Sequence, residues 1–199
     1  MIALCLVAAM AGPGAMAQTP ASPATAVQAP DNDYAVFRAL SEPFGVIDFI
    51  TYSYTYGFAR ADREAGRTDP AHAAIRTAFA RNMNAQRDGV IDVVMRHAFP
   101  AFSHDEIVRL KTVVACPCFA RVQAATLGAL RTGGDIEAEG TKVLMNDPDY
   151  QALAPADREL MGRFIAEISK GMIAAVPQIN PIALATMAQL DGSSGARRH

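Results

Sequence analysis

The sequence has little charge of either sign, and this excludes several classes of function. Charged residues make up 19% of the 199 residues, and the formal net charge is −2. A nucleic-acid-binding surface needs an excess of lysine and arginine that this composition does not provide. After residue 17, no stretch is long and apolar enough to cross a membrane as a helix. We therefore expect neither a nucleic-acid partner nor a transmembrane span.

Motifs that carry catalysis or hold a metal are also missing. The chain has no Gly-x-Ser-x-Gly nucleophile motif, no phosphate-binding glycine loop, no His-Glu-x-x-His and no paired Cys-x-x-Cys. Nine methionines offer soft sulfur ligands for copper(I). However, Met83, Met161 and Met172 fall on or beside apolar helix stripes, where methionine usually fills the core. We predict no catalytic residue and no cofactor.

Residues 1–17 have the pattern of a cleavable signal peptide. An apolar run reaches Met10, Gly12–Gly14 break it, and Ala15-Met16-Ala17 supplies the small residues that a signal peptidase reads. The run is too short to span a bilayer, and no basic side chain precedes it. We expect cleavage after Ala17 and export to the periplasm.

The rest of the chain divides into a linker, one domain and a tail. Residues 18–30 (QTPASPATAVQAP) carry no charge and are rich in proline, alanine, serine and threonine, which predicts a flexible linker. Residues 31–191 are long enough for a single domain with a hydrophobic core. Residues 192–199 (GSSGARRH) are predicted to be a disordered tail.

Residues 31–191 contain several sequence motifs that are typical of helix starts. Polar side chains followed by proline open helices at Asp69-Pro70, Asp147-Pro148 and Asn180-Pro181, and Ser103 with Glu106 fits a capping box. One long helix, passing through Gly89, is predicted by the helical spacing of Ile75, Phe79, Met83, Val90 and Val94. The predicted fold class is all-α: a single compact multi-helix bundle with proline-broken helices.

Ile50–Phe58 is the one segment with a strand-like pattern, because aromatic and small polar residues alternate along it. No second region alternates in the same way, so a strand here would have no partner. We therefore predict a helix for this segment.

Cys116-Pro117-Cys118 is the most unusual local feature. In an oxidising compartment two nearby cysteines are expected to pair or to bind something. Pro117 lacks the amide that would bond to the carbonyl of Val113, so we predict a helix break there. Three interpretations stay open: two small buried apolar residues at a kink, a reducible disulfide, or a redox-active or metal site with Cys116 and Cys118 as ligands.

One part of the sequence resembles a known family. The residues that carry the resemblance are Phe102-Ser103-x-x-Glu106-Ile107-x-x-Leu110, then Cys116-Pro117, then Arg121. They are similar to the signature of the bacterial envelope family catalogued as domain of unknown function twenty fifty-nine: Phe-Thr-x-x-Glu-Leu-x-x-Leu, an aromatic pair, Ser-Pro-x-Gly and a basic residue. The resemblance covers residues 94–121 and implies an exported helical protein, with no activity assigned.

The chain also departs from that signature. Val113-Val114 stand in place of the aromatic pair, Cys116 in place of serine, and Phe119 in place of glycine. The resemblance implies that Pro117 marks a regular break between helices. The cysteines would then be an addition particular to this chain.

Two functional hypotheses follow. The first is a non-enzymatic binding or interaction module of the bacterial envelope, whose partner is an envelope protein or an apolar ligand. Its groove would be lined by aromatic side chains, namely Phe44, Phe49, Tyr52, Tyr56 and Phe58. The alternative is a thiol redox or metal-binding protein that uses Cys116 and Cys118.

Overall fold

The computed structural model describes residues 30–66, 70–132 and 135–195, and every regular element in them is a helix. The all-α prediction is therefore confirmed. The expected signal peptide (1–17) and residues 18–29 of the expected linker lie outside the described residues. The first helix begins at Pro30, and the last reaches Gly195, beyond the predicted domain end at residue 191. Residues 196–199 of the expected tail also lie outside the described residues.

The helices follow one another with short connections. In chain order they are α1 (Pro30–Ala39), α2 (Ser41–Phe44), α3 (Val46–Glu64), α4 (Pro70–Ala85), α5 (Arg87–Ala98), the short 3₁₀ helix η1 (Phe99–Ala101), α6 (His104–Val114), α7 (Pro117–Thr132), α8 (Ile136–Asn146), α9 (Pro148–Ala152), α10 (Pro155–Ala174) and α11 (Val176–Gly195).

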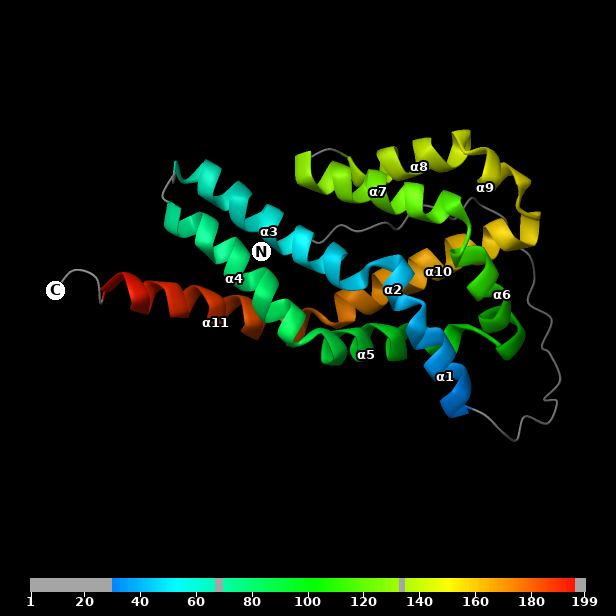
Figure 1. Ribbon diagram of the computed structural model, residues 1–199, viewed down its shortest axis with the longest axis horizontal. Coiled ribbons are helices and arrows are strands. Elements are labelled where there is room, and N and C mark those ends of the chain that lie inside the picture. Colours follow the sequence, from blue (N-terminus) through cyan, green and yellow to red (C-terminus); the bar gives the residue numbers. More distant parts are fainter. Residues whose placement is uncertain (1–29, 67–69, 133–134, 196–199) are drawn as a thin grey trace.

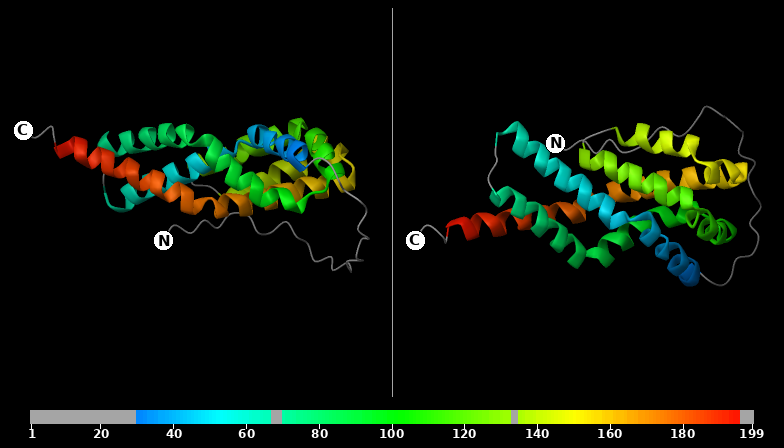
Figure 2. Two further views of the ribbon diagram at one scale, coloured as in Figure 1. Left: turned by 90° about the horizontal axis from the view of Figure 1, so that it is seen from below. Right: turned by 45° about the horizontal axis from the view of Figure 1, so that its top comes forward.

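The bundle is elongated, and its two ends are built from different helices (Figures 1 and 2). At one end α11 packs on α4, and α4 packs on α3. At the other end α10 packs on α5 and α6, with α1 beside them. The helices α7, α8 and α9 form a layer along one edge, and α3 joins this layer to the rest because it contacts both α4 and α7.

The centre of the core is the ring of Phe164 on α10, which has no exposed surface. Four other rings surround it with centroid separations of 5.7 to 6.5 Å, namely Phe37, Phe44, Phe102 and Phe119. These rings come from α1, α2, α7 and the segment before α6, so a single side chain joins five parts of the chain. Aromatic rings at such separations attract one another beyond the effect of burial alone.

The aromatic segment Ile50–Phe58 lies inside α3, which confirms the helix prediction. Its helical spacing places Tyr54 in the core, where the ring stacks on Phe79 at 5.3 Å between centroids. Gly45 separates α2 from α3 with φ of 69°, a conformation that side chains disfavour. That turn is held by the amide of Gln123, which donates to the carbonyl of Phe44 at 3.0 Å.

The prediction of one long helix over Ile75–Val94 is wrong. The chain bends at Gln86, whose φ of −103° and ψ of 10° are not helical, and α4 and α5 are separate helices. The reason lies in the packing partners. Before the bend, α4 packs on α3 and α11, whereas after it α5 packs on α10. One apolar stripe thus serves two different surfaces, and a straight helix could not reach both.

The predicted start of the last helix at Asn180-Pro181 is also wrong. Helix α11 begins at Val176, and Pro181 lies in its second turn. The preceding helix ends near Ala175, whose carbonyl accepts the amides of Gln178 and Ile179 and so opens the new helix. The chain bends by 52° between α10 and α11. The boundary between α10 and α11 is therefore set by a buried bend and not by a polar capping side chain.

Within the described residues, no single helix has both the length and the apolar composition needed to cross a membrane. Two bent pairs, α6 with α7 and α10 with α11, meet that requirement of length and composition only when each is taken together.

Candidate functional site

The site is the corner where α6 meets α7. Helix α6 ends at Val114, α7 begins at Pro117, and their axes differ by 73°. The predicted helix break at Pro117 is therefore confirmed. Proline suits this position because the first residue of a helix has no intrahelical partner for its amide.

The start of α6 is fixed by the predicted capping box. The backbone amide of Ser103 donates to Oε2 of Glu106 at 2.9 Å, and the amide of Glu106 donates to Oγ of Ser103 at 3.4 Å. Glu106 also pairs with Arg163 of α10. Burial acts to raise the pKa of Glu106, but the amide of Ser103 and the Arg163 guanidinium outweigh burial and lower it. Glu106 is thus a charged structural group.

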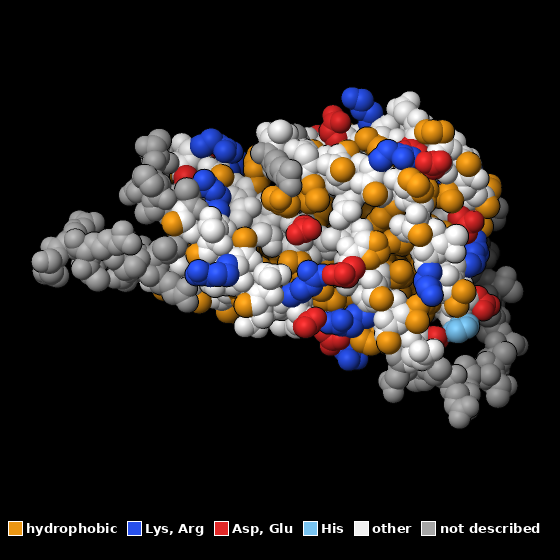
Figure 3. Space-filling view, viewed as in Figure 1, with side chains coloured by type: hydrophobic (Ala, Val, Ile, Leu, Met, Phe, Trp, Pro, Cys, Tyr) orange, Lys and Arg blue, Asp and Glu red, His pale blue; other side chains and the backbone are white. Residues whose placement is uncertain are grey.

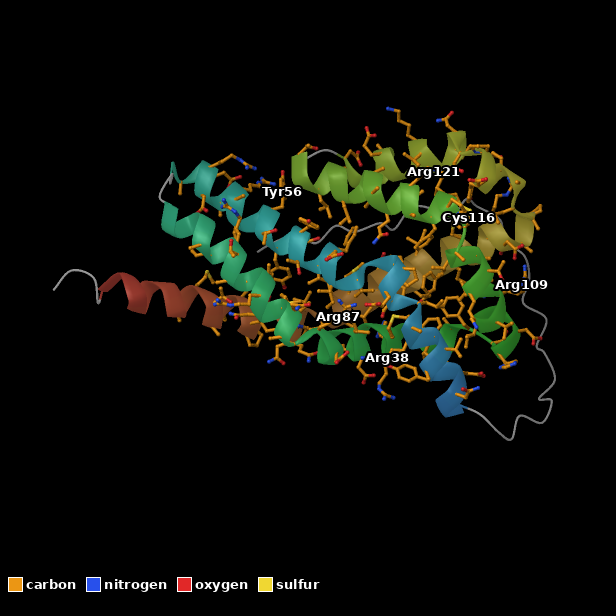
Figure 4. The ribbon with its side chains drawn as sticks, viewed as in Figure 1. Arg38, Tyr56, Arg87, Arg109, Cys116 and Arg121 are labelled. Atoms are coloured by element: carbon orange, nitrogen blue, oxygen red, sulfur yellow. A yellow bond between two sulfur atoms is a disulfide. The ribbon has the colours of Figure 1, made fainter. Side chains whose placement is uncertain are left out.

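Cys116 and Cys118 are brought together at the corner. Their sulfur atoms are in bonding contact, and their Cα atoms lie 5.2 Å apart. Cys118 has no exposed surface and belongs to the core, whereas Cys116 is half-buried and packs against the edge of the core. Figure 4 shows Cys116 at the N-terminal end of α7. The sequence prediction that these two residues could pair is supported by this contact.

Backbone groups at the start of α7 point toward Cys116. The carbonyl of Cys116 accepts the amide of Phe119 at 2.9 Å, and its Sγ accepts the amide of Cys118 at 3.3 Å. These are the two acceptors that a residue at the N-cap position supplies to a helix. Cys116 therefore caps α7 with a sulfur atom in place of the usual oxygen.

Arg121 ties the first turns of α7 to the junction of α8 and α9. Its Nε and Nη2 donate to the two carboxylate oxygens of Asp147 at 2.5 and 2.9 Å, and Nη2 also pairs with Asp149. The amides of Asp149 and Tyr150 donate to Asp147 as well, at 2.9 and 3.2 Å. The pKa of Asp147 is lowered to about 2, chiefly by Arg121, although burial opposes the shift.

Sequence reasoning missed this network. It identified Asp147 as a helix start, which the structure confirms, but not as the partner of Arg121. The two residues lie 26 positions apart on different helices. The only sequence signal was a basic residue soon after Cys116-Pro117, and nothing local points from it to a particular carboxylate.

The five predicted groove residues do not share one environment. Phe44 and Phe49 are buried in the core, so they do not line an open surface. Tyr52 and Phe58 are half-buried and pack against the core, and Tyr56 is half-buried with the Arg63 guanidinium 5.8 Å from its ring centre. Figure 3 shows hydrophobic side chains gathered on this face between α3 and α7. The ring of Phe58 packs on Phe79 of α4, at 5.5 Å between centroids. Tyr52 and Tyr56 are four residues apart and therefore share another side of α3, so of the five predicted residues these two remain candidates for ligand contact.

Among the described residues, the fold brings no further metal ligands to Cys116 and Cys118. Within residues 30–66, 70–132 and 135–195, the structure brings together no group of three or more His, Cys, Asp or Glu side chains suited to a metal ion. Cys116 and Cys118 are thus the chemically reactive pair that the fold assembles. Comparisons with family models, with curated proteins and with solved structures found no match to this chain.

Proposed function

We propose that this chain is an exported protein of the bacterial envelope in which Cys116 and Cys118 exchange between the dithiol and the disulfide form. The observation that supports this most is the bonding contact of the two sulfur atoms at the α6–α7 corner. In an oxidising compartment such a pair forms a disulfide, whereas in the cytosol it would be kept reduced. The proposed export and the proposed chemistry therefore support each other.

The short spacing of the cysteines favours an exchangeable bond over a structural one. Only Pro117 separates them, so the disulfide closes a very small ring. A disulfide stabilises a fold mainly by restricting the unfolded chain, and this effect grows with the length of the closed loop. A small ring restricts little, so the protein can lose and regain the bond without unfolding.

The corner also keeps its shape without help from the disulfide. Helix α7 is held by the Arg121 ion pairs and by Phe119, whose ring packs on Phe44 and Phe164. These contacts do not involve sulfur. We therefore expect the reduced and oxidised proteins to share one fold.

The test is a redox titration of the purified full chain in dithiothreitol buffers. The fraction of free Cys116 and Cys118 is read by alkylation and peptide mass mapping, and far-UV circular dichroism is recorded alongside. We expect full interconversion with a reduction potential above about −300 mV, the boundary below which structural disulfides fall, and unchanged helicity. A bond that is reduced only after denaturant unfolds the protein would overturn the proposal.

A second candidate function is binding of a partner or an apolar ligand on the face between α3 and α7. It is favoured by the half-buried rings of Tyr52 and Tyr56, which share one side of α3, and by the hydrophobic side chains gathered between α3 and α7 (Figure 3). Aromatic side chains that combine a large apolar surface with partial exposure are common at binding surfaces.

This candidate is tested by native mass spectrometry and by uptake of a hydrophobic dye. We expect a co-purified ligand or dye binding that falls in Tyr56→Ser. The matched control is Met145→Ser, since Met145 is 64% exposed and lies on α8, outside the α3–α7 pair. An apo mass and no dye uptake would exclude binding there.

A further inference from the structure

The two cysteines at the α6–α7 corner have unequal roles to play, and this inference rests on the exchange function proposed above. The inequality begins with access. Cys118 is fully buried, while Cys116 is half-buried. The residues around Cys116 are small and exposed, namely Ala115, Pro117 and Ala120. We therefore expect an incoming sulfur atom to reach Cys116 more readily than Cys118.

The second inequality is electrostatic. Cys116 occupies the N-cap position of α7, and its Sγ accepts the amide of Cys118 at 3.3 Å. The N-terminus of a helix carries a partial positive charge, and α7 has 16 residues of aligned peptide dipoles. A thiolate at this position gains a charge-assisted hydrogen bond and a favourable dipole. A thiolate on Cys118, inside the core, would lose its hydration.

We infer that Cys116 is the nucleophile of the reduced pair and that Cys118 is the resolving thiol. The substrate class is a solvent-exposed disulfide, R–S–S–R′. The Cys116 thiolate attacks one sulfur, the substrate S–S bond breaks, and R′–S⁻ leaves and takes a proton from water. Cys118 then loses its proton and attacks Sγ of Cys116, which releases R–S⁻. The substrate gains two electrons, and the pair is oxidised to its disulfide.

The substitutions that separate the two roles are Cys118→Ala and Cys116→Ser. The first leaves Cys116 as the only reactive thiol at the corner. The second leaves Cys118 and keeps an oxygen at the cap, because serine is a preferred N-cap residue. Both are made in the full chain, and peptide mass mapping locates each label, so Cys5 does not interfere.

Two measurements are made on each variant: the rate of iodoacetamide alkylation across pH, and mixed-disulfide formation with oxidised glutathione or with insulin as a protein disulfide. We expect Cys118→Ala to be alkylated at least tenfold faster than Cys116→Ser at pH 7, with a midpoint below the ordinary cysteine value of about 8.5. Mixed disulfides should accumulate only on Cys118→Ala. Comparing oxidised glutathione with insulin shows whether Cys116 reacts with a small-molecule disulfide or with a protein disulfide.

Faster labelling of Cys118 than of Cys116 would overturn the assignment, even if the wild-type redox titration still showed exchange. A wild-type pair that does not exchange would instead refute the proposed function itself. A third measurement avoids the variants altogether. The reduced wild-type protein is treated with less than one equivalent of iodoacetamide, and the first label must fall on Cys116.

Discussion

Reduction of the Cys116–Cys118 disulfide should lower the free energy of unfolding only slightly. The bond closes a ring of three residues, since the cysteines are two positions apart. The chain-entropy relation for a ring of that size gives roughly 5.4 cal/mol/K, or about 1.6 kcal/mol at 25 °C. The same relation gives about 3 kcal/mol for a 15-residue loop. The expected loss is therefore about half that of a typical structural disulfide.

The assay is urea unfolding of the oxidised and the dithiothreitol-reduced protein, followed by far-UV circular dichroism. We expect a lower midpoint with an unchanged denaturant slope, because the surface exposed on unfolding hardly changes. Cys116→Ser serves as the control, since it removes the bond and retains a capping atom. Its unfolding free energy should match that of the reduced protein.

A loss of more than about 3 kcal/mol would refute the reasoning, because it exceeds what so small a ring can contribute. It would mean that the bond holds the α6–α7 corner together. Thiol exchange would then require local unfolding, and the proposed function would have to be abandoned for a structural one.

Three further predictions use the same unfolding assay. Gly171→Ala should lose about 1–3 kcal/mol because the new methyl would overlap a backbone carbonyl of α5, whereas Gly162→Ala on the same helix meets open space and should gain about 0.5–1 kcal/mol. Phe164→Ala should cost about 3–5 kcal/mol. The pKa of Asp147 is about 2 in the folded protein and 3.8 ordinarily. The stability that its pairing with Arg121 contributes should therefore be complete above about pH 4 and lost as pH falls through 2. The urea midpoint of Asp147→Asn should lack this acid-dependent fall.

The parts of the fold that were predictable are those determined by neighbours in the sequence. The Ser103–Glu106 capping box, the break at Pro117 and the short helix after Asp147 all depend on contacts within a few residues. Such contacts leave the same signature wherever they occur. The helix over Ile50–Phe58 was predictable for a different reason, because a strand needs a partner that the chain does not contain.

The parts that were not predictable depend on distant packing. The bend at Gln86 arises because α4 and α5 have different partners, and the spacing of their apolar residues is continuous across it. Likewise, the helical spacing of the aromatic residues does not indicate which of them are buried: Phe44 lies in the core, whereas Tyr56 is half-buried. The site was predictable in its residues, Cys116 and Cys118, but the unequal burial of the two was not.

The position of Asp147 has a consequence for how the protein opens. Its carboxylate caps the start of α9 and pairs with Arg121 on α7, while its backbone amide donates to the carbonyl of Leu144 at the end of α8. Three helices thus meet at one residue, so its contacts are made or lost together. Native-state hydrogen exchange should show the amides of α8 and α9 opening as one cooperative unit. In Asp147→Asn that unit should exchange faster, while the amides around Phe164 keep their protection.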